Sequence, residues 1–309
     1  MIEARGLTKR YGDKTAVDNL SFQVRPGHVT GFLGPNGAGK STTMRMILGL
    51  DHPSSGNALV DGKPYAQHTN PMHEIGALLE AKSVHQGRNA YNHLLCLARA
   101  DGIPKRRVRE VLELVGLQDV AKRRTGGFSL GMSQRLGLAQ ALLGDPPTLM
   151  LDEPVNGLDP EGIRWVRELL KSLAAEGRAV FVSSHLMSEM SLMAEHLVIV
   201  GRGRLIADTS MTEFINNNVH SNVRVRTPQA TELADELARQ GAEVNPGENG
   251  YLEVNGLGTD SIGDIAAEHR LTIHELFGHS VSLEQAFMDL TRDSVEYHAH
   301  TPADAEATE

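Results

Sequence analysis

One short stretch strongly limits the possible folds of this chain, and it reads Gly34-Pro35-Asn36-Gly37-Ala38-Gly39-Lys40-Ser41-Thr42. It fits the pattern G-x-x-x-x-G-K followed by Ser or Thr, in which glycines let backbone amides turn toward an anion at a helix start. The apolar run His28–Leu33 precedes it, and residues 41–50 have a helical pattern. Lys40 would supply a charge to the outer phosphates, and the Ser41 hydroxyl would ligate Mg²⁺. A plain strand-to-helix turn is the alternative, but the pattern and its context favour a nucleotide site.

A second apolar run ends in two acids, Asp152 and Glu153. Strand ends deliver side chains to the edge of a parallel sheet, so these acids are expected beside the phosphate loop. There Asp152 would hold Mg²⁺ and Glu153 would polarise an attacking water, as phosphoryl transfer requires. His185 follows another apolar strand and would contact the terminal phosphate. Two solvated carboxylates before Pro154 are the alternative, which the neighbouring phosphate loop makes less attractive.

Strands and helices alternate over residues 1 to about 210, which predicts an α/β fold with a largely parallel sheet covered by helices. Residues 85–145 read as a helical insertion in this domain. A small α+β domain is predicted over 211–292, after a linker at Asn216–Asn218. The tail 293–309 carries acids but no Lys or Arg, which is typical of a disordered segment.

Composition excludes several classes of protein. The net charge of −9 argues against a general nucleic-acid binder, which would usually be basic. A single cysteine, Cys96, rules out an internal disulfide, and its apolar surroundings predict a buried side chain. No stretch approaches the ~18 apolar residues that span a bilayer, and the N-terminus has no apolar signal core. We therefore expect a cytoplasmic chain, which does not exclude a membrane partner.

Further motifs, in order along the chain, resemble the ATP-binding subunit of ABC transporters. Residues 128–135, Phe-Ser-Leu-Gly-Met-Ser-Gln-Arg, look like the family signature L-S-G-G-Q-x-Q-R. His185 matches the switch histidine, and Tyr11 matches the aromatic residue that stacks on adenine. The segment similar to the D-loop consists of Asn156, Gly157, Leu158 and Asp159. This resemblance covers residues 1 to about 210 and implies a P-loop NTPase core with an antiparallel N-terminal β part, using ATP and Mg²⁺.

The resemblance also implies a head-to-tail dimer of two copies. The signature of one copy, namely Ser129, Leu130, Gly131 and Met132, would act on the ATP bound by the other. Ser129 is expected just before a helix that starts near Met132, and a hydroxyl with free amides at a helix start forms an anion site. A chain with one phosphate loop and one signature then needs a twofold partner to complete two sites.

The similarity is greatest to subunits of bacitracin, lantibiotic and daunorubicin exporters, whose cargo is carried by a separate multi-span membrane subunit. The segment Ser282–Met288 resembles the C-terminal element of those proteins. The implied function is ATP hydrolysis that powers export of a drug, peptide or lipid-like compound from the inner face of the membrane. The partner is expected to contact the region from Ala81 to Ala100.

The sequence departs from the family pattern at the signature and at the Q-loop. Leu130 and Met132 replace a Gly and a Gln of the signature, and Glu80 stands where the family has its Q-loop glutamine. A carboxylate at position 80 would be a charged Mg²⁺ ligand, although it repels the terminal phosphate. A glutamate here occurs in the bacitracin-type group and so supports that assignment.

Two other functions fit part of the sequence. A soluble ABC ATPase acting on nucleic acid or ribosomes would carry long coiled coils, zinc fingers or a second cassette, none of which this sequence shows. A nucleotide sensor that does not hydrolyse ATP is disfavoured by the presence of Lys40, Asp152, Glu153 and His185.

Overall fold

The chain divides into two compact units. The computed structural model describes residues 1–80, 84–218, 221–247, 250–280 and 282–292. The larger unit is Met1–Met211 with the described residues that follow Asp289, and the smaller unit is Thr212–Asp289. The tail 293–309, predicted to be disordered, lies outside the described residues. Within the described part, no helix has the length and apolar character needed to cross a membrane.

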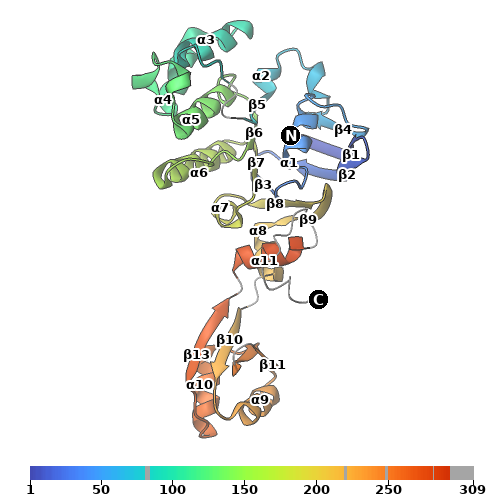
Figure 1. The fold of residues 1–309 in the computed structure, drawn as a ribbon, viewed down its shortest axis with the longest axis vertical. Helices are drawn as coiled ribbons and strands as arrows, with labels where there is room; N and C mark the ends of the chain where they lie inside the picture. The colour runs from blue at the N-terminus through green and yellow to red at the C-terminus, as the bar shows by residue number, and fades with distance from the viewer. Residues whose placement is uncertain (81–83, 219–220, 248–249, 281, 293–309) are drawn as a thin grey trace, which may run out of the picture. The chain divides into compact units, whose positions relative to one another are not determined.

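A six-stranded sheet forms the centre of the larger unit (Figure 1). All its strands run parallel except the last, which pairs antiparallel with its neighbour. In spatial order they are β5 (Ile75–Leu78), β6 (Thr148–Asp152), β7 (Ala179–Ser184), β3 (Val29–Leu33), β8 (His196–Gly201) and β9 (Arg204–Ser210). Every residue of β3 and β7 is buried, which explains why these strands are almost continuous apolar runs. The predicted α/β class is confirmed.

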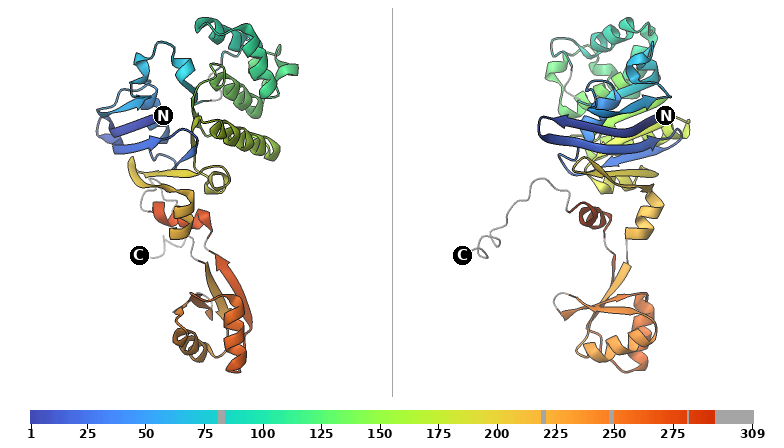
Figure 2. Two further views of the ribbon diagram at one scale, coloured as in Figure 1. Left: turned by 180° about the vertical axis from the view of Figure 1, so that it is seen from behind. Right: turned by 90° about the vertical axis from the view of Figure 1, so that its right-hand side faces the viewer.

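A second, antiparallel sheet lies on one side of the six-stranded sheet, while α5 and α6 lie on the other (Figures 1 and 2). It contains β2 (Lys14–Val24), β1 (Ile2–Tyr11) and β4 (Ser55–Val60). Helix α1 (Lys40–Ile47) contacts both sheets. Between the sheets, the rings of Phe22, Phe32 and Phe181 lie 5.0–5.5 Å apart, centroid to centroid. This shared aromatic core fixes the phosphate-loop strand against the N-terminal strands.

The insertion between β5 and β6 is helical, as predicted. After α2 (Pro71–Glu74) come α3 (Ala90–Ala100), α4 (Lys105–Leu114) and α5 (Leu130–Ala141), followed beyond β6 by α6 (Pro160–Ala175) and α7 (Met187–Ser191). The prediction that Cys96 is buried is wrong, because its side chain is exposed. Helix α3 buries the face formed by Ala90, His93, Leu94 and Ala98, and Cys96 lies off that stripe.

Two helix boundaries differ from the prediction. Helix α5 begins at Leu130 rather than near Met132, because the Ser129 hydroxyl accepts a hydrogen bond from the Met132 amide at 3.2 Å and caps the helix. Residues 216–218, predicted to be a linker, instead end helix α8 (Met211–Asn218). Phe214 in this helix is buried, and the Asn218 side chain donates to the Phe214 carbonyl at 2.9 Å, so burial and local bonding outweigh the low helix propensity of asparagine.

The smaller unit is a four-stranded antiparallel sheet with helices. Its strands, in spatial order, are β11 (Glu243–Pro246), β12 (Leu252–Asn255), β10 (Ser221–Arg226) and β13 (Glu275–Ser280). Its further helices are α9 (Ala230–Arg239), α10 (Thr259–Glu268) and α11 (Leu283–Thr291). The order β-α-β-β-α-β with this strand arrangement is ferredoxin-like. Leu233 and Leu237 of α9 pack with Val225, Val254 and Ile262 in a core of its own.

Candidate functional site

The phosphate loop connects the end of β3 to the start of α1, as the sequence predicts. Gly39, at the N-terminal cap of α1, has a φ of 96°. A Cβ there would lie 2.5 Å from the Ala16 carbonyl oxygen, so only glycine fits both the conformation and the space. The loop lines a cavity of about 530 Å³ together with Tyr11, Asp152 and Glu153, among others. This volume is in the range of small-molecule sites.

Lys40 is buried at the start of α1, with 8% of its surface exposed. Its ammonium donates to the carbonyl oxygens of Gly34 at 2.6 Å and Pro35 at 3.2 Å. Burial lowers the pKa of Lys40, while the carboxylates of Glu153 and Asp152 act in the opposite direction. The loop thus holds a cation against its own carbonyls, where a phosphate would be a stronger partner.

Asp152, at the end of β6, lies next to the first turn of α1. The Ser41 hydroxyl donates to Asp152 Oδ2 at 2.6 Å, and the Ser183 hydroxyl donates to Asp152 Oδ1. These are the hard oxygen donors that Mg²⁺ prefers. Among the described residues, no three His, Cys, Asp or Glu side chains gather to hold an ion. A magnesium ion here would therefore need phosphate oxygens from the nucleotide as further ligands.

Glu153 and His185 meet across adjacent strand ends. Glu153 Oε1 and His185 Nδ1 are 2.8 Å apart. The backbone of Glu153 has a φ of 49°, an unfavourable region for a non-glycine residue. It is held there because its amide donates to Ser183 Oγ at 3.1 Å and its carbonyl accepts from Gln134 Nε2 at 2.9 Å. Strained backbone at this position aims the carboxylate at the edge of the sheet.

Tyr11 lies at the end of β1 and is 49% exposed, so its ring is available for stacking. Its hydroxyl donates to Asp51 Oδ2 at 3.3 Å, and Arg45 Nε donates to the same oxygen at 2.7 Å. The Lys9 ammonium is 5.0 Å from the ring centroid. Burial and the Asp51 carboxylate raise the pKa of Tyr11. Asp51 and Arg45 therefore orient the ring, although no motif marks either residue in the sequence.

Glu80 is exposed just after β5. It lines a cavity of about 390 Å³ with Ser41, Arg45 and Asp152, among others. The structure therefore brings it to the same groove as the predicted magnesium ligands. Residues 81–83, which begin the expected partner surface, lie outside the described residues.

The signature and the D-loop lie against each other in one chain. A Cβ on Gly157 would approach Leu130 Cδ2 to 2.1 Å, so this glycine allows the two loops to touch. Leu130 is 43% exposed. The Asp159 carboxylate caps α6 by accepting from the Gly162 amide at 2.9 Å. Among the described residues, none of positions 129–132 lines the phosphate-loop cavity, although Leu130 lines a smaller cavity of about 190 Å³ with Asp152 and Glu153.

Three supporting residues were missed by sequence reasoning: Gln134, Ser183 and Asp51. Ser183 binds both Asp152 and the Glu153 amide. It directly precedes Ser184-His185 in a buried strand, and a buried hydroxyl two residues before a candidate histidine was the available signal. Gln134 lies within the signature segment, and its side-chain amide donates to the Glu153 carbonyl.

Comparison with known proteins gives consistent matches. A family profile described as ABC transporter matches residues 17–156, and one for a domain of unknown function matches residues 221–284. The uncharacterized ABC transporter ATP-binding protein YhcH of Bacillus subtilis is 38% identical over 97% of this chain and 99% of its own length. The bacitracin transport ATP-binding protein BcrA of Bacillus licheniformis is 44% identical over 71% of this chain and 72% of its own. A solved ATP-binding subunit of an ABC transporter has a TM-score of 0.65 at 26% identity, covering 70% of this chain and 92% of that one.

Proposed function

We propose that this chain, which belongs to the family of ABC transporter ATP-binding proteins, works as one half of a head-to-tail dimer that drives a separate membrane subunit. The chain is an ATPase of the exporter type. One observation carries the dimer: the signature at Ser129–Met132 is absent from the described lining of the chain's own phosphate-loop cavity. A twofold partner would supply it.

The residues at the edge of the sheet have different roles in ATP hydrolysis. The amides of the phosphate loop and Lys40 hold the phosphates, and Tyr11 stacks on adenine. Ser41 and Asp152 hold Mg²⁺ with the nucleotide oxygens, and Glu80 faces the same groove. Mg²⁺, when bound, neutralises charge that develops on the phosphates.

The hydrolytic step needs a positioned water. Glu153 lies beside Asp152 and is oriented by His185 at 2.8 Å, which leaves its second oxygen to accept a proton from water. His185 would contact the terminal phosphate. This division assigns proton acceptance to Glu153 and charge stabilisation to Lys40 and His185.

The cargo class follows from the relatives. Bacitracin, lantibiotic and Nod factor exporters all have ATP-binding proteins similar to this chain. These names favour export of a peptide, drug or lipid-like compound, with the chain held at the inner face of the membrane by its partner. No observation favours the nucleic-acid alternative.

The test is co-expression with the membrane protein encoded beside this chain, followed by affinity purification in detergent. The wild type should retain the membrane subunit and hydrolyse ATP. Arg88→Glu, a charge reversal at an exposed position of the expected partner surface, should weaken retention. Lys171→Glu, at an exposed position of α6, is the matched control. If no membrane protein associates and turnover responds instead to RNA, DNA or ribosomes, the proposal is wrong.

A further inference from the structure

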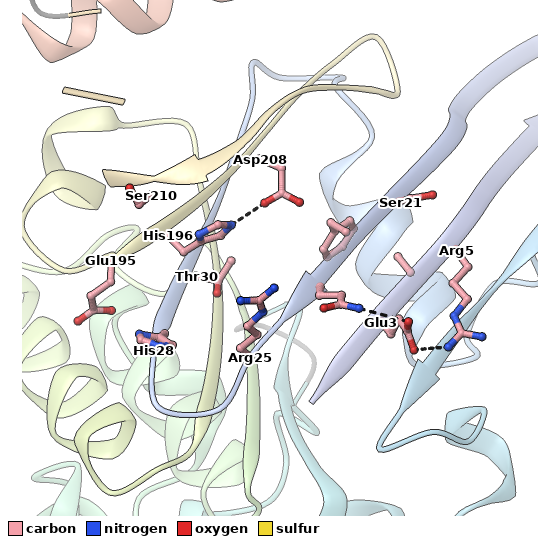
Figure 3. A pocket seen from close by; sticks show the side chains of 13 residues that line it. Glu3, Arg5, Ser21, Arg25, His28, Thr30, Glu195, His196, Asp208 and Ser210 are labelled. Carbon is pink, nitrogen blue, oxygen red and sulfur yellow. Dashed lines mark hydrogen bonds and ion pairs between the residues drawn. The ribbon is translucent and has the colours of Figure 1, made fainter. Parts of the chain in front are cut away.

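A second cavity in the larger unit lies at the opposite end of β3 from the phosphate loop (Figure 3). Its volume is about 530 Å³, and strands β1, β2, β3, β8 and β9 all contribute to its wall. Thr30, near the start of β3, lines it, whereas the phosphate loop follows Leu33 at the other end of the same strand. The nucleotide site therefore does not account for this cavity.

The carboxylates of this cavity already have partners. Glu3 accepts from Arg5 at 2.7 Å, and Glu195 Oε2 accepts from the Val29 amide at 2.7 Å. Asp208 Oδ1 lies 2.5 Å from His196 Nε2. Glu3 and Asp208 each lie against a basic side chain, whereas the partner of Glu195 is a neutral backbone amide. No metal-binding group of three His, Cys, Asp or Glu is found in the described part of the chain.

Two hydrogen-bond donors of the cavity, unlike its carboxylates, have no partner in the described part of the chain. Within the described residues, neither the Arg25 guanidinium nor the Thr30 hydroxyl has a hydrogen-bond partner. Thr30 is 1% exposed and lines the cavity near the start of β3. Figure 3 shows the Arg25 side chain pointing toward Thr30 and His196. The groups left to bind a ligand are therefore the Arg25 guanidinium and the Thr30 hydroxyl.

The floor of the cavity is apolar. Ala4 and Phe22 line it and are 3% and 4% exposed. An apolar floor beneath a guanidinium suits a compact organic body that carries one anionic group. Arginine forms its strongest hydrogen bonds with carboxylate and phosphate, whose paired oxygens match its planar fork.

We propose that this cavity binds a small organic anion through one carboxylate or phosphate group held by Arg25 and Thr30. The ligand would contact β1 and β2 of the antiparallel sheet and β8 and β9 of the six-stranded sheet, and would link the two. A ligand that binds only the folded chain stabilises it by RT ln(1 + [L]/Kd), so its melting temperature rises with ligand concentration.

The experiment uses the full chain with Mg²⁺ and a saturating non-hydrolysable ATP analogue, so that probes cannot occupy the phosphate loop. Phenyl phosphate and benzoate are the two probes, and benzyl alcohol is the uncharged control. Amide NMR shifts report the location, and titration reports the affinity. At least one anion should bind saturably and shift the amides of Thr30 and His196, and the stronger probe identifies the anionic group. Benzyl alcohol should not bind.

Three variants localise the binding. Arg25→Gln should weaken it ~10-fold or more, because a charge-assisted hydrogen bond is lost. Thr30→Val should weaken it by a smaller factor, because it removes the hydroxyl and preserves side-chain shape. Arg106→Gln, at an exposed position of α4, should change nothing. The proposal is overturned if neither anion binds, if Arg25→Gln binds as the wild type does, or if the shifts lie only around the phosphate loop.

Discussion

In the larger unit, Lys40, Asp152 and Glu153 gather at one edge of a sheet, whereas in the smaller unit two pairs of opposite charges lie on the sheet. Arg224 Nη2 lies 2.6 Å from Glu253 Oε1, and Arg226 pairs with Glu275. The first arrangement leaves charged groups facing a cavity that a ligand can enter, whereas in the second each arginine already has a carboxylate partner. Charged side chains that face a shared cavity therefore indicate a binding site, whereas charged side chains paired across a sheet indicate a structural role.

The two regions also differ in the burial of charge. In the larger unit, the buried Lys40 ammonium lies against carbonyl groups, while non-glycine residues with positive φ occur in both units, at Glu153 and at Arg270. In the smaller unit, the core side chains of α9 and α10 simply pack on the sheet. Burying a charge lowers stability, so substitutions at Lys40 should separate stability from ligand binding.

Glu153→Gln should have the largest effect. Turnover should fall ~10²–10⁴-fold because the proton acceptor is lost, while ATP binding is kept and an ATP-bound dimer accumulates. Steady-state ATPase assays and size-exclusion chromatography with ATP measure this. Glu168→Gln, at an exposed position of α6, is the control. A near-normal rate in the Glu153 variant would remove this residue from the mechanism.

Lys40→Met should separate binding from stability. ATP affinity should fall ~10²-fold or more, since charged hydrogen bonds to phosphate are lost. The nucleotide-free variant should nevertheless melt at a higher temperature, because no buried cation remains. The pKa of Lys40 is lowered from its ordinary 10.5, so between the lowered pKa and 10.5 the unfolded wild type binds more protons than the folded chain. The unfolding free energy should thus gain a positive slope between the lowered pKa and 10.5, which Lys40→Met abolishes. Equal stability of the two proteins would contradict this account.

Glu80→Gln restores the common family residue and should have a smaller effect. ATP binding should persist, while the Mg²⁺ concentration needed for half-maximal turnover should change a few-fold as one carboxylate leaves the groove. Titrating turnover against Mg²⁺, with and without the membrane subunit, measures it. If both titrations match those of the wild type, Glu80 neither contributes to the metal site nor couples it to the partner.

Arg224→Ala in the smaller unit should have the smallest effect. Its ion pair is partly solvent-exposed, so the unfolding free energy should fall by ~1 kcal/mol or less. Turnover should stay at the wild-type level. A large loss of ATPase activity in a folded Arg224→Ala protein would show that the smaller unit takes part in the chemistry.

The sequence predicts those parts of the site that are formed by residues close together in the chain. The residues of the phosphate loop are consecutive in the sequence, and so are the two acids at the end of β6. The ends of parallel strands then bring these two motifs together. The contacts of Glu153 with Gln134 and Ser183 span 19 and 30 positions and depend on how the strands are ordered. The second cavity, at the opposite end of β3 from the phosphate loop, is lined by residues from Glu3 to Ser210, which no local pattern connects. Strands β11 and β13 were not predicted, because Glu243–Pro246 and Glu275–Ser280 are short and contain few β-branched residues.

If each ATP site is shared between two copies, two inactive variants should complement each other when mixed. Lys40→Met removes the ammonium group that would bind phosphate, and Ser129→Arg places a large side chain in the signature loop. In a head-to-tail dimer, the mixed pair contains one intact site, made from the phosphate loop of the Ser129 variant and the signature of the Lys40 variant. Equal mixing should restore about a quarter of wild-type turnover, since about half the dimers are mixed and each has one working site. A mixture as inactive as either variant alone would contradict the shared site.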